Sequence, residues 1–209
     1  MMEEAYDDFL KGINVPIVDA WPLDYVLEKQ TLVDGVAVEC GVFEGRSINK
    51  IARALPDRAV IGYDSFEGLP EKWERPDWSM DKGHFSTRGE LPEVPANVKL
   101  VRGWFDETLP CFAEDAEDAE EACISLLHVD CDLYSSTKTV LTQLSPFFVD
   151  GTVIVFDELL GYPNHEKHEI LAFYEYLQDA LFRPEWLARE NETKEEVAVR
   201  LVSKTPTSA

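Results

Sequence analysis

Short runs of apolar residues alternate along this chain with longer segments in which apolar residues recur at every third or fourth position. Short runs of this kind are typical of buried strands, and the longer pattern is typical of helices. The predicted strands are residues 36–39, 59–63, 98–102, 123–129 and 152–156. The predicted helices are residues 47–55, 136–148 and 164–181, the last with Asn164 as its N-terminal cap.

Two more strands are predicted near the end of the sequence, at residues 186–189 and 197–202, and the segment 190–196 between them predicts a hairpin. Helical crossovers are the natural links between parallel strands, so the alternation indicates a doubly wound, mostly parallel α/β sheet. The hairpin adds an antiparallel strand at the edge, which makes a seven-stranded sheet. The length of 209 residues favours one domain, residues 1–209, with a helical N-terminal segment at residues 1–34.

The segment 67–97 interrupts this alternation, because four prolines divide it and Trp73, Trp78 and Phe85 lie between them. Long loops inside compact domains are commonly functional or disordered. The aromatic residues favour an ordered lid or one wall of a binding site. A surface insertion packed on the edge of the sheet explains them equally well, and both interpretations stay open at this stage.

Charge narrows the function classes more than composition does. The chain has 19 Lys and Arg against 41 Asp and Glu, a formal charge of −22, which disfavours nucleic acid and anionic membranes as partners. No apolar run is long enough to span a bilayer, and the acidic start lacks the features of a signal peptide. The four cysteines match no metal-binding spacing, so a reduced, cytoplasmic protein is expected.

The loop after the first predicted strand has the form E-x-G-x-x-x-G, with Glu39, Gly41 and Gly45. It differs from the G-x-G-x-x-G pattern of dinucleotide-binding proteins. Glycines allow the backbone to approach a ligand closely, and Glu39 favours a cationic group beside it. Asp64 ends the next strand, where an acidic residue accepts hydrogen bonds from ribose hydroxyls. The two features together favour S-adenosylmethionine, and the alternative is an ordinary turn with a surface Asp.

A second group of acidic residues follows the fourth and fifth predicted strands: Asp130, Asp132, Asp157 and Glu158. Adjacent parallel strands bring them together, and four ionised carboxylates require compensation by protons or by a cation. Oxygen ligands suit Mg²⁺, Mn²⁺ or Ca²⁺ better than zinc. The alternative is that the four side chains point outward and cap the helices that follow. His128, inside the fourth strand, is expected beside the site and not as a ligand.

Five segments of the chain taken together resemble successive motifs of the macrocin O-methyltransferase (TylF-like) family. They are VECGVFEGRS, GYDSFEGLPE, VRGWFDETLP, LLHVDCDLYSST and GTVIVFDELLGY. The resemblance covers roughly residues 30–165 in order, and the third and fourth segments are its most specific parts. It implies a Rossmann-like class I methyltransferase fold, S-adenosylmethionine as cofactor and a divalent metal, usually magnesium. It also implies methylation of a hydroxyl, typically on a sugar of a natural product.

The resemblance also implies roles for individual residues. Asp130 is similar to the family's first metal ligand, and Asp157 and Glu158 stand where the family has an Asp-Asp pair. Asp132 is similar to the general base. Glu158 departs from the pattern, since its extra methylene moves the carboxylate by about 1.5 Å. The expected cofactor contacts are Glu39, Gly41, Gly45, Ser47, Asp64, Ser65, Gly103, Trp104 and Asp130.

Two other functions remain open from the sequence. Asp130-Cys131-Asp132 also fits the D-x-D motif of metal-dependent glycosyltransferases, although that hypothesis leaves the glycine loop unexplained. A non-catalytic domain that binds the cofactor is the second alternative. A small-molecule hydroxyl acceptor is the expected partner, and Tyr6, Phe9 and Trp21 in the short N-terminal segment predict a homodimer.

Overall fold

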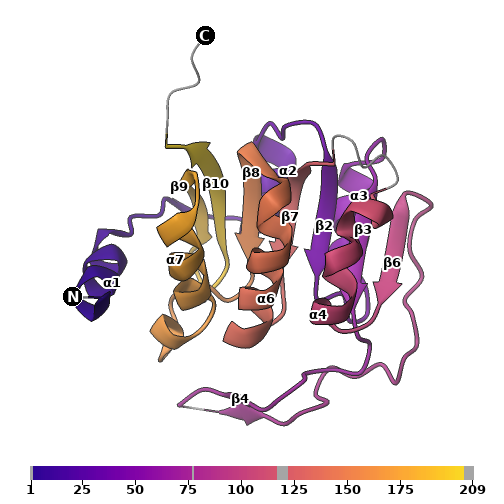
Figure 1. Cartoon of the computed structure of the whole chain (residues 1–209), viewed down its shortest axis with the longest axis horizontal. Helices are drawn as coiled ribbons and strands as arrows, with labels where there is room; N and C mark the ends of the chain where they lie inside the picture. Colours follow the sequence, from indigo (N-terminus) through magenta and orange to yellow (C-terminus); the bar gives the residue numbers. More distant parts are fainter. Residues whose placement is uncertain (1, 77, 117–121, 205–209) are drawn as a thin grey trace.

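The computed structural model describes residues 2–76, 78–116 and 122–204. Its centre is one sheet of eight strands, most of which run side by side across Figure 1. From one edge to the other the strands are β1 (Ile17–Val18), β9 (Phe182–Glu190), β10 (Val197–Ser203), β8 (Phe148–Phe156), β7 (Ile124–Val129), β2 (Val36–Cys40), β3 (Val60–Asp64) and β6 (Val98–Arg102). All neighbours pair in parallel except β10, which is antiparallel to both β8 and β9.

Helices cover both faces of the sheet, as Figure 1 shows. One face carries α4 (Phe105–Thr108), α5 (Phe112–Asp115), α6 (Tyr134–Leu144) and α7 (Glu169–Asp179). The other carries α2 (Pro22–Lys29) and α3 (Arg46–Ala54). Short 3-10 turns are η1 (Leu109–Cys111), η2 (Ser145–Phe147) and η3 (His165–Lys167). Because the central strands are buried on both sides, β7 is mostly apolar and buried along its whole length without alternation, which is why its position was predictable.

The α/β, doubly wound architecture predicted from the sequence is confirmed, and two details differ. The sheet has eight strands instead of seven, because the two-residue strand β1 pairs with β9. The antiparallel strand of the hairpin, β10, lies between β8 and β9 and not at the edge. Asn164 also differs from expectation: it has a positive φ of 66°, forms no side-chain cap and precedes η3, while α7 begins at Glu169.

The segment 67–97 contains a small hairpin of β4 (Trp73–Glu74) and β5 (Ser79–Met80), which lies below the carboxyl ends of the main strands in Figure 1. It has a separate apolar cluster in which Leu69 and Trp73 pack against Leu133, the residue after the D-x-D motif. The segment is therefore ordered by contact with the sheet's carboxyl edge.

The N-terminal helix α1 (Met2–Gly12) packs against the same chain. The rings of Tyr6 and Phe9 lie 4.8 and 5.0 Å from that of Tyr174, and Tyr6 donates a hydrogen bond to the carbonyl of Glu166. Two of the three aromatic residues that motivated the homodimer prediction are thus used inside the chain, while Trp21 remains 52% exposed. Within the described residues, no helix has the length and apolar character needed to cross a membrane.

Candidate active site

A cavity of about 680 Å³ opens at the carboxyl ends of the parallel strands. This is where an open α/β sheet places its ligands, because the loops on the two sides of the switch point between β2 and β7 diverge there. The sequence-predicted residues that line it are Gly41, Ser47, Asp64, Ser65, Gly103, Trp104, Asp130, Asp132, Asp157 and Glu158. Glu39 and Gly45 are not among its described lining residues.

Gly41 brings the first two loops of the site into direct contact. Its φ is 95°, and a Cβ built there would lie 1.6 Å from the carbonyl oxygen of Asp130. No side chain fits in that space, so the backbone of the glycine loop borders the start of the acidic loop. Gly45 has a different role, because it is the left-handed residue immediately before α3 and packs against Pro92.

The carboxylate of Asp64 connects the glycine loop to the segment that follows β3. Its Oδ2 accepts hydrogen bonds from the backbone N–H groups of Val42 and Phe43 at 2.7 and 2.8 Å. Its Oδ1 accepts one from Phe66 at 2.6 Å. A carboxylate oxygen has two acceptor directions, so Oδ1 keeps one for a ligand while both directions of Oδ2 are taken.

Glu39 acts on the cavity through His128. The Oε1 atom of Glu39 lies 2.8 Å from Nδ1 of His128, and both side chains are buried. Burial disfavours a charged imidazole, but the hydrogen bond to Glu39 and the charges of Glu39, Asp130 and Asp157 outweigh it and raise the pKa of His128 to about 10. His128 is therefore an imidazolium that lines the cavity. Glu39 does not line the cavity, and its carboxylate pairs with His128.

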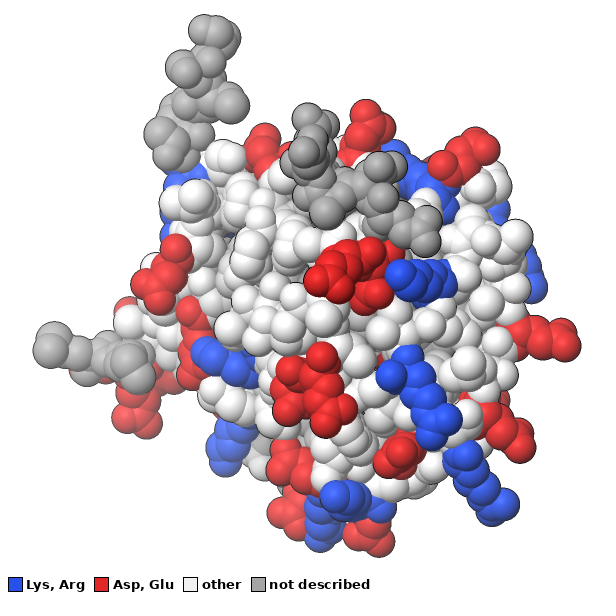
Figure 2. Space-filling view, turned by 45° about the vertical axis from the view of Figure 1, so that its right-hand side comes forward, with Lys and Arg blue, Asp and Glu red and all other residues white. Residues whose placement is uncertain are grey.

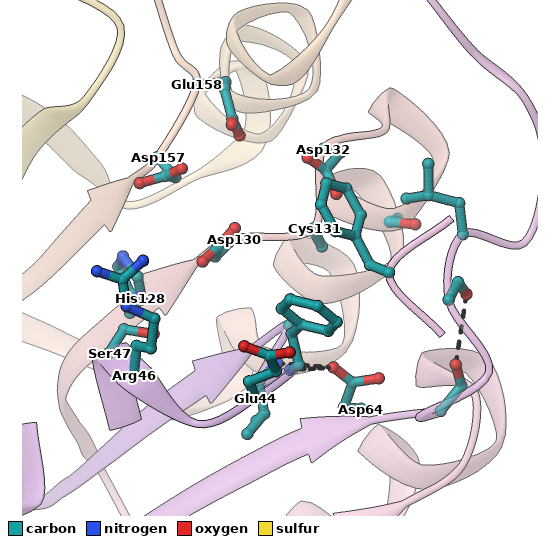
Figure 3. Close-up of a pocket in the computed structure, with 18 of the residues that line it drawn as sticks. Glu44, Arg46, Ser47, Asp64, His128, Asp130, Cys131, Asp132, Asp157 and Glu158 are labelled. Carbon is teal, nitrogen blue, oxygen red and sulfur yellow. Dashed lines mark hydrogen bonds between the residues drawn. The ribbon is translucent and has the colours of Figure 1, made fainter. Parts of the chain in front are cut away.

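The four predicted acidic side chains face a common space in Figure 3, but they form two groups. One oxygen each of Asp130, Asp132 and Glu158 lie within 4.8 Å of one another. Asp157 instead groups in the same way with His128 and Glu196. The sequence predicts Asp157 as a metal ligand and Asp132 as a residue beside the metal. In the structure, Asp132 is the residue that groups with Asp130 and Glu158, and Asp157 lies in the other group.

The charge of this cluster is only partly compensated in the protein itself. Burial, followed by the charge of Asp157, raises the pKa of Asp130 and of Glu158 well above the ordinary range. The same two causes raise the pKa of Asp132 to about 7, although Arg75 opposes the shift. Glu158 Oε2 is buried without a hydrogen-bond partner. Raised pKa values and an unpartnered carboxylate oxygen are what a hard divalent cation would relieve, so the donor set fits Mg²⁺ or a similar ion.

Several residues of this site carry no signal in the sequence. Glu196 immediately precedes β10, and its buried carboxylate accepts a hydrogen bond from the N–H of Leu23 at 2.8 Å. The residue before it, Glu195, pairs with Arg75 of the segment 67–97 at 2.8 Å. Phe43 and Phe85 both line the cavity, and their rings contact each other edge to face with centroids 5.5 Å apart. None of these pairs is close in sequence, so only the fold brings them together.

A doubly wound sheet with a close-packed glycine loop, an acidic residue at the end of the next strand and a cavity at the switch point is a Rossmann-like nucleotide-binding architecture. Comparison with known proteins makes the class more specific. Residues 38–159 match the family described as a methyltransferase domain, and the chain belongs to that family.

Two curated relatives come from Streptomyces species. The tetracenomycin 4'-O-methyltransferase of Streptomyces olivaceus is 30% identical over 159 residues, which cover 65% of this chain and 58% of the relative. The demethyldecarbamoylnovobiocin O-methyltransferase of Streptomyces niveus is 30% identical over 151 residues, which cover 63% and 55%. The resemblance to natural-product O-methyltransferases is thereby confirmed, and the chain spans less than two thirds of the length of these relatives.

Solved structures confirm the fold. The crystal structure of the calicheamicin methyltransferase CalS11 superposes with a TM-score of 0.62 at 24% identity, covering 95% of this chain and 79% of that one. The O-methyltransferase NovP gives a TM-score of 0.54 at 23% identity and covers 87% and 76%. The class I methyltransferase fold inferred from the sequence motifs is therefore the fold of this chain.

Proposed function

We propose that this chain transfers a methyl group from S-adenosylmethionine to a hydroxyl of a small molecule, a sugar or another diol of a natural product, with the help of a divalent metal. The observation that carries the proposal is one cavity joining the glycine loop and Asp64 to the cluster Asp130, Asp132 and Glu158. The names of the relatives support a hydroxyl acceptor, and the two tetracenomycin and novobiocin enzymes act on decorated natural products.

In this proposal the glycine loop and its neighbours hold the cofactor. Asp64 offers its remaining Oδ1 acceptor direction to a ribose hydroxyl. Gly41 lets the backbone approach the methionine end, and Ser47 lies at the start of α3, where its hydroxyl reaches the same part of the cavity. Gly103 and Trp104, after β6, form the wall expected next to the adenine. The cofactor, when bound, supplies an electrophilic methyl group on sulfur.

We assign the metal to Asp130 and Glu158, with Asp157 as the third ligand expected from the family motif. Glu158 Oε2 has no hydrogen-bond partner among the described residues, and Asp130 lies between Asp157 and Asp132 in Figure 3. Oxygen-only ligands favour Mg²⁺, and the longer Glu158 side chain leaves Mn²⁺ or Ca²⁺ acceptable. A divalent ion, when bound, supplies a Lewis acid that lowers the pKa of an acceptor hydroxyl.

Asp132 is the proposed general base. Its pKa of about 7 matches the working pH of a base, and its carboxylate lies within 4.8 Å of the proposed ligands Asp130 and Glu158. It can therefore take the proton that the acceptor hydroxyl loses as the methyl group arrives. A positioned base of this kind contributes roughly 10²–10⁴-fold to the rate.

The test separates these roles with two isosteric substitutions. Asp132→Asn should keep the affinity for S-adenosylmethionine and for Mg²⁺ in titration calorimetry but reduce methyl transfer by about 10²-fold or more, because it removes the proton acceptor. Asp157→Asn should weaken Mg²⁺ binding together with turnover. Full activity after treatment with EDTA would exclude the metal, and equal loss of Mg²⁺ in both variants would make Asp132 a ligand.

The glycosyltransferase alternative does not agree with the family match, since it leaves the methyltransferase domain at residues 38–159 without a function. A non-catalytic cofactor-binding domain stays testable. It would bind S-adenosylmethionine with an affinity that does not change with metal, and it would transfer no methyl group to any vicinal diol.

We also propose a cytoplasmic location and a homodimer. All four cysteines are free, which suits a reducing compartment. Trp21 is exposed at the cavity mouth, where a second copy would cover it. Light scattering at micromolar concentration should give twice the mass of one chain, and a monomer throughout would remove the homodimer.

A further inference from the structure

Glu169, the first residue of α7, is a fully buried carboxylate outside the lining of the cavity. Its two oxygens bind two different parts of the chain. Oε1 accepts a hydrogen bond from the hydroxyl of Thr137 at 3.0 Å, and Oε2 accepts one from the backbone N–H of Glu158 at 3.3 Å. Both donors are neutral. A buried carboxylate is costly to keep in a fold, which calls for a reason why this one stands here.

One partner of Glu169 belongs to the acidic loop after β8, and the other lies in the helix α6 that follows the loop with Asp130 and Asp132. Thr137 lies in the first turn of α6, its N–H bonds to the carbonyl of Leu133, and its Oγ1 lies 3.5 Å from Sγ of Cys131. Because the Thr137 hydroxyl gives its hydrogen to Glu169, Cys131 is the donor in that second contact. Glu158 belongs to the loop after β8. A continuous chain of contacts thus runs from Cys131 through Thr137 and Glu169 to Glu158.

We propose that Glu169 is a positioning residue that fixes the distance between the two acidic loops and so prepares the proposed metal site. The proposal rests on the function proposed above. Asp130 and Asp132 come from one loop and Glu158 from the other, and their oxygens converge within 4.8 Å. Like charges at that distance repel and would drive the loops apart. The Glu169 side chain bonds both to Glu158 and to Thr137 in the helix that follows the other loop, and these two hydrogen bonds oppose the separation.

The chain contains a matched control for this idea. Glu175 lies on the same helix, and it also bonds to α6, through the hydroxyl of Tyr134 and the ammonium of Lys138. It therefore joins the same two helices but touches neither acidic loop. Glu169→Gln and Glu175→Gln make the same chemical change, and only the first should alter the metal site.

The first measurement is the affinity of the full chain for Mn²⁺, determined by electron paramagnetic resonance. Glu169→Gln and Thr137→Val should each weaken Mn²⁺ binding about 10- to 100-fold, the usual effect of losing a group that orients metal ligands. Thr137→Val leaves the Glu169 side chain unchanged, so its effect comes from the lost hydrogen bond between the two residues. Thr137→Ser should restore the affinity, and Glu175→Gln should match the wild type. The affinity for S-adenosylmethionine should stay the same in all five proteins.

The second measurement does not need a metal. Amide hydrogen exchange by NMR should be at least about tenfold faster in Glu169→Gln at two places together, as expected for a local opening. One is Glu158 in the loop after β8, and the other is Leu133 and Thr137, where the first acidic loop joins α6. Faster exchange in neither loop, or the same change in Glu175→Gln, would overturn the positioning role. A wild type that binds neither Mn²⁺ nor S-adenosylmethionine would instead overturn the proposed function, and the exchange data would still decide the role of Glu169.

Discussion

At the scale of single residues, Asp64 has two tasks that compete for the same atoms. Its carboxylate already accepts three backbone hydrogen bonds, from Val42, Phe43 and Phe66. Two of these three donors, Phe43 and Phe66, have positive φ values of 47° and 58°, which are uncommon for large side chains. The carboxylate therefore holds a strained loop in place and, in the proposed function, also binds the ribose. A substitution there affects the fold and the ligand together.

We expect Asp64→Asn to weaken binding of S-adenosylmethionine and to lower the free energy of unfolding. The amide has one acceptor oxygen instead of two, so at least one backbone N–H loses its partner, at a cost of roughly 1–3 kcal/mol. Titration calorimetry and thermal unfolding measure the two effects. Ser65→Ala is a suitable control for the stability effect, because Ser65 is the next residue but accepts only one backbone hydrogen bond, from Glu67. Unchanged stability in Asp64→Asn would contradict the role described for the loop.

At the scale of elements, the hairpin β4–β5 is held to the rest of the protein mainly by Arg75. Its guanidinium lies 3.7 Å from the ring centroid of Tyr162 and 4.7 Å from that of Trp78, and it pairs with Glu195 at 2.8 Å. The side chain is only 6% exposed, so this ion pair is not weakened by solvent as a surface pair is. The hairpin in turn presses Trp73 against Leu133, next to the proposed base.

Arg75→Gln should loosen the hairpin without unfolding the sheet. A desolvated cation–π contact is worth about 2 kcal/mol, and the neutral Gln side chain cannot keep the ion pair with Glu195. Limited proteolysis should cut within residues 70–90 faster than in the wild type, and the KM for the acceptor should rise. Lys72→Gln is the control, because its ion pair with Glu74 is exposed and worth little. Equal cleavage of both variants would show that Arg75 does not anchor the hairpin.

The strands of the parallel sheet were predictable because both of their faces are buried, which makes β7 and the second half of β8 mostly apolar and without alternation. The glycine loop, Asp64 and the D-x-D motif were predictable because they follow those runs directly. Strand β1 was not, since two residues at an edge leave no pattern.

The acidic residues that support the site were also beyond the sequence. Glu169 and Glu196 are buried, whereas a Glu in a sequence is expected to be exposed. Their partners are far along the chain: Glu196 bonds to Leu23, and Glu169 to Thr137. Only a hairpin that returns to the middle of the sheet, and a helix packed across α6, create these contacts. For the same reason the sequence placed Asp157 with Glu158, while the fold places it with His128 and Glu196.

At the scale of the whole molecule, the surface carries a large excess of acidic groups, and the net charge is −22. On the face shown in Figure 2 they are spread among Lys and Arg side chains and do not form one continuous patch. A separate group of acidic side chains is buried in the interior, where burial raises the pKa of Asp132 and Glu196, which line the cavity, to about 7 and that of Glu169, behind the cavity, to about 8.

This internal charge should make stability depend on pH and on divalent metal. The folded chain binds protons on Asp132, Glu169 and Glu196 more tightly than the unfolded chain, whose acids titrate near 4. Without metal, the contribution of these groups to the free energy of unfolding should be largest near about pH 4 and should fall as the pH rises to about 8.

Adding Mg²⁺ at pH 8 should release protons and restore stability, by about 2.7 kcal/mol at a hundredfold excess over the dissociation constant. Thermal unfolding at pH 6 and pH 8, with and without Mg²⁺, measures both effects, and Na⁺ at equal ionic strength is the control. Stability that rises between pH 6 and pH 8 in the absence of metal would contradict the assigned protonation.

The start of strand β10 has a consequence for how the protein is made. Glu195 and Glu196 are consecutive, yet one pairs with Arg75 of the hairpin β4–β5 and the other holds the N–H of Leu23 at the start of α2. Residues leave the ribosome in order, and chains begin to fold during synthesis. The glycine loop, Asp64 and the acidic loops therefore leave the ribosome before the two glutamates that tie this part of the chain to the segment 67–97 and to α2. A nascent chain that stops before residue 195 has the cofactor-binding half of the sheet but lacks the Glu196 side chain of the cavity lining, so the cavity is completed only after residue 196 has been added.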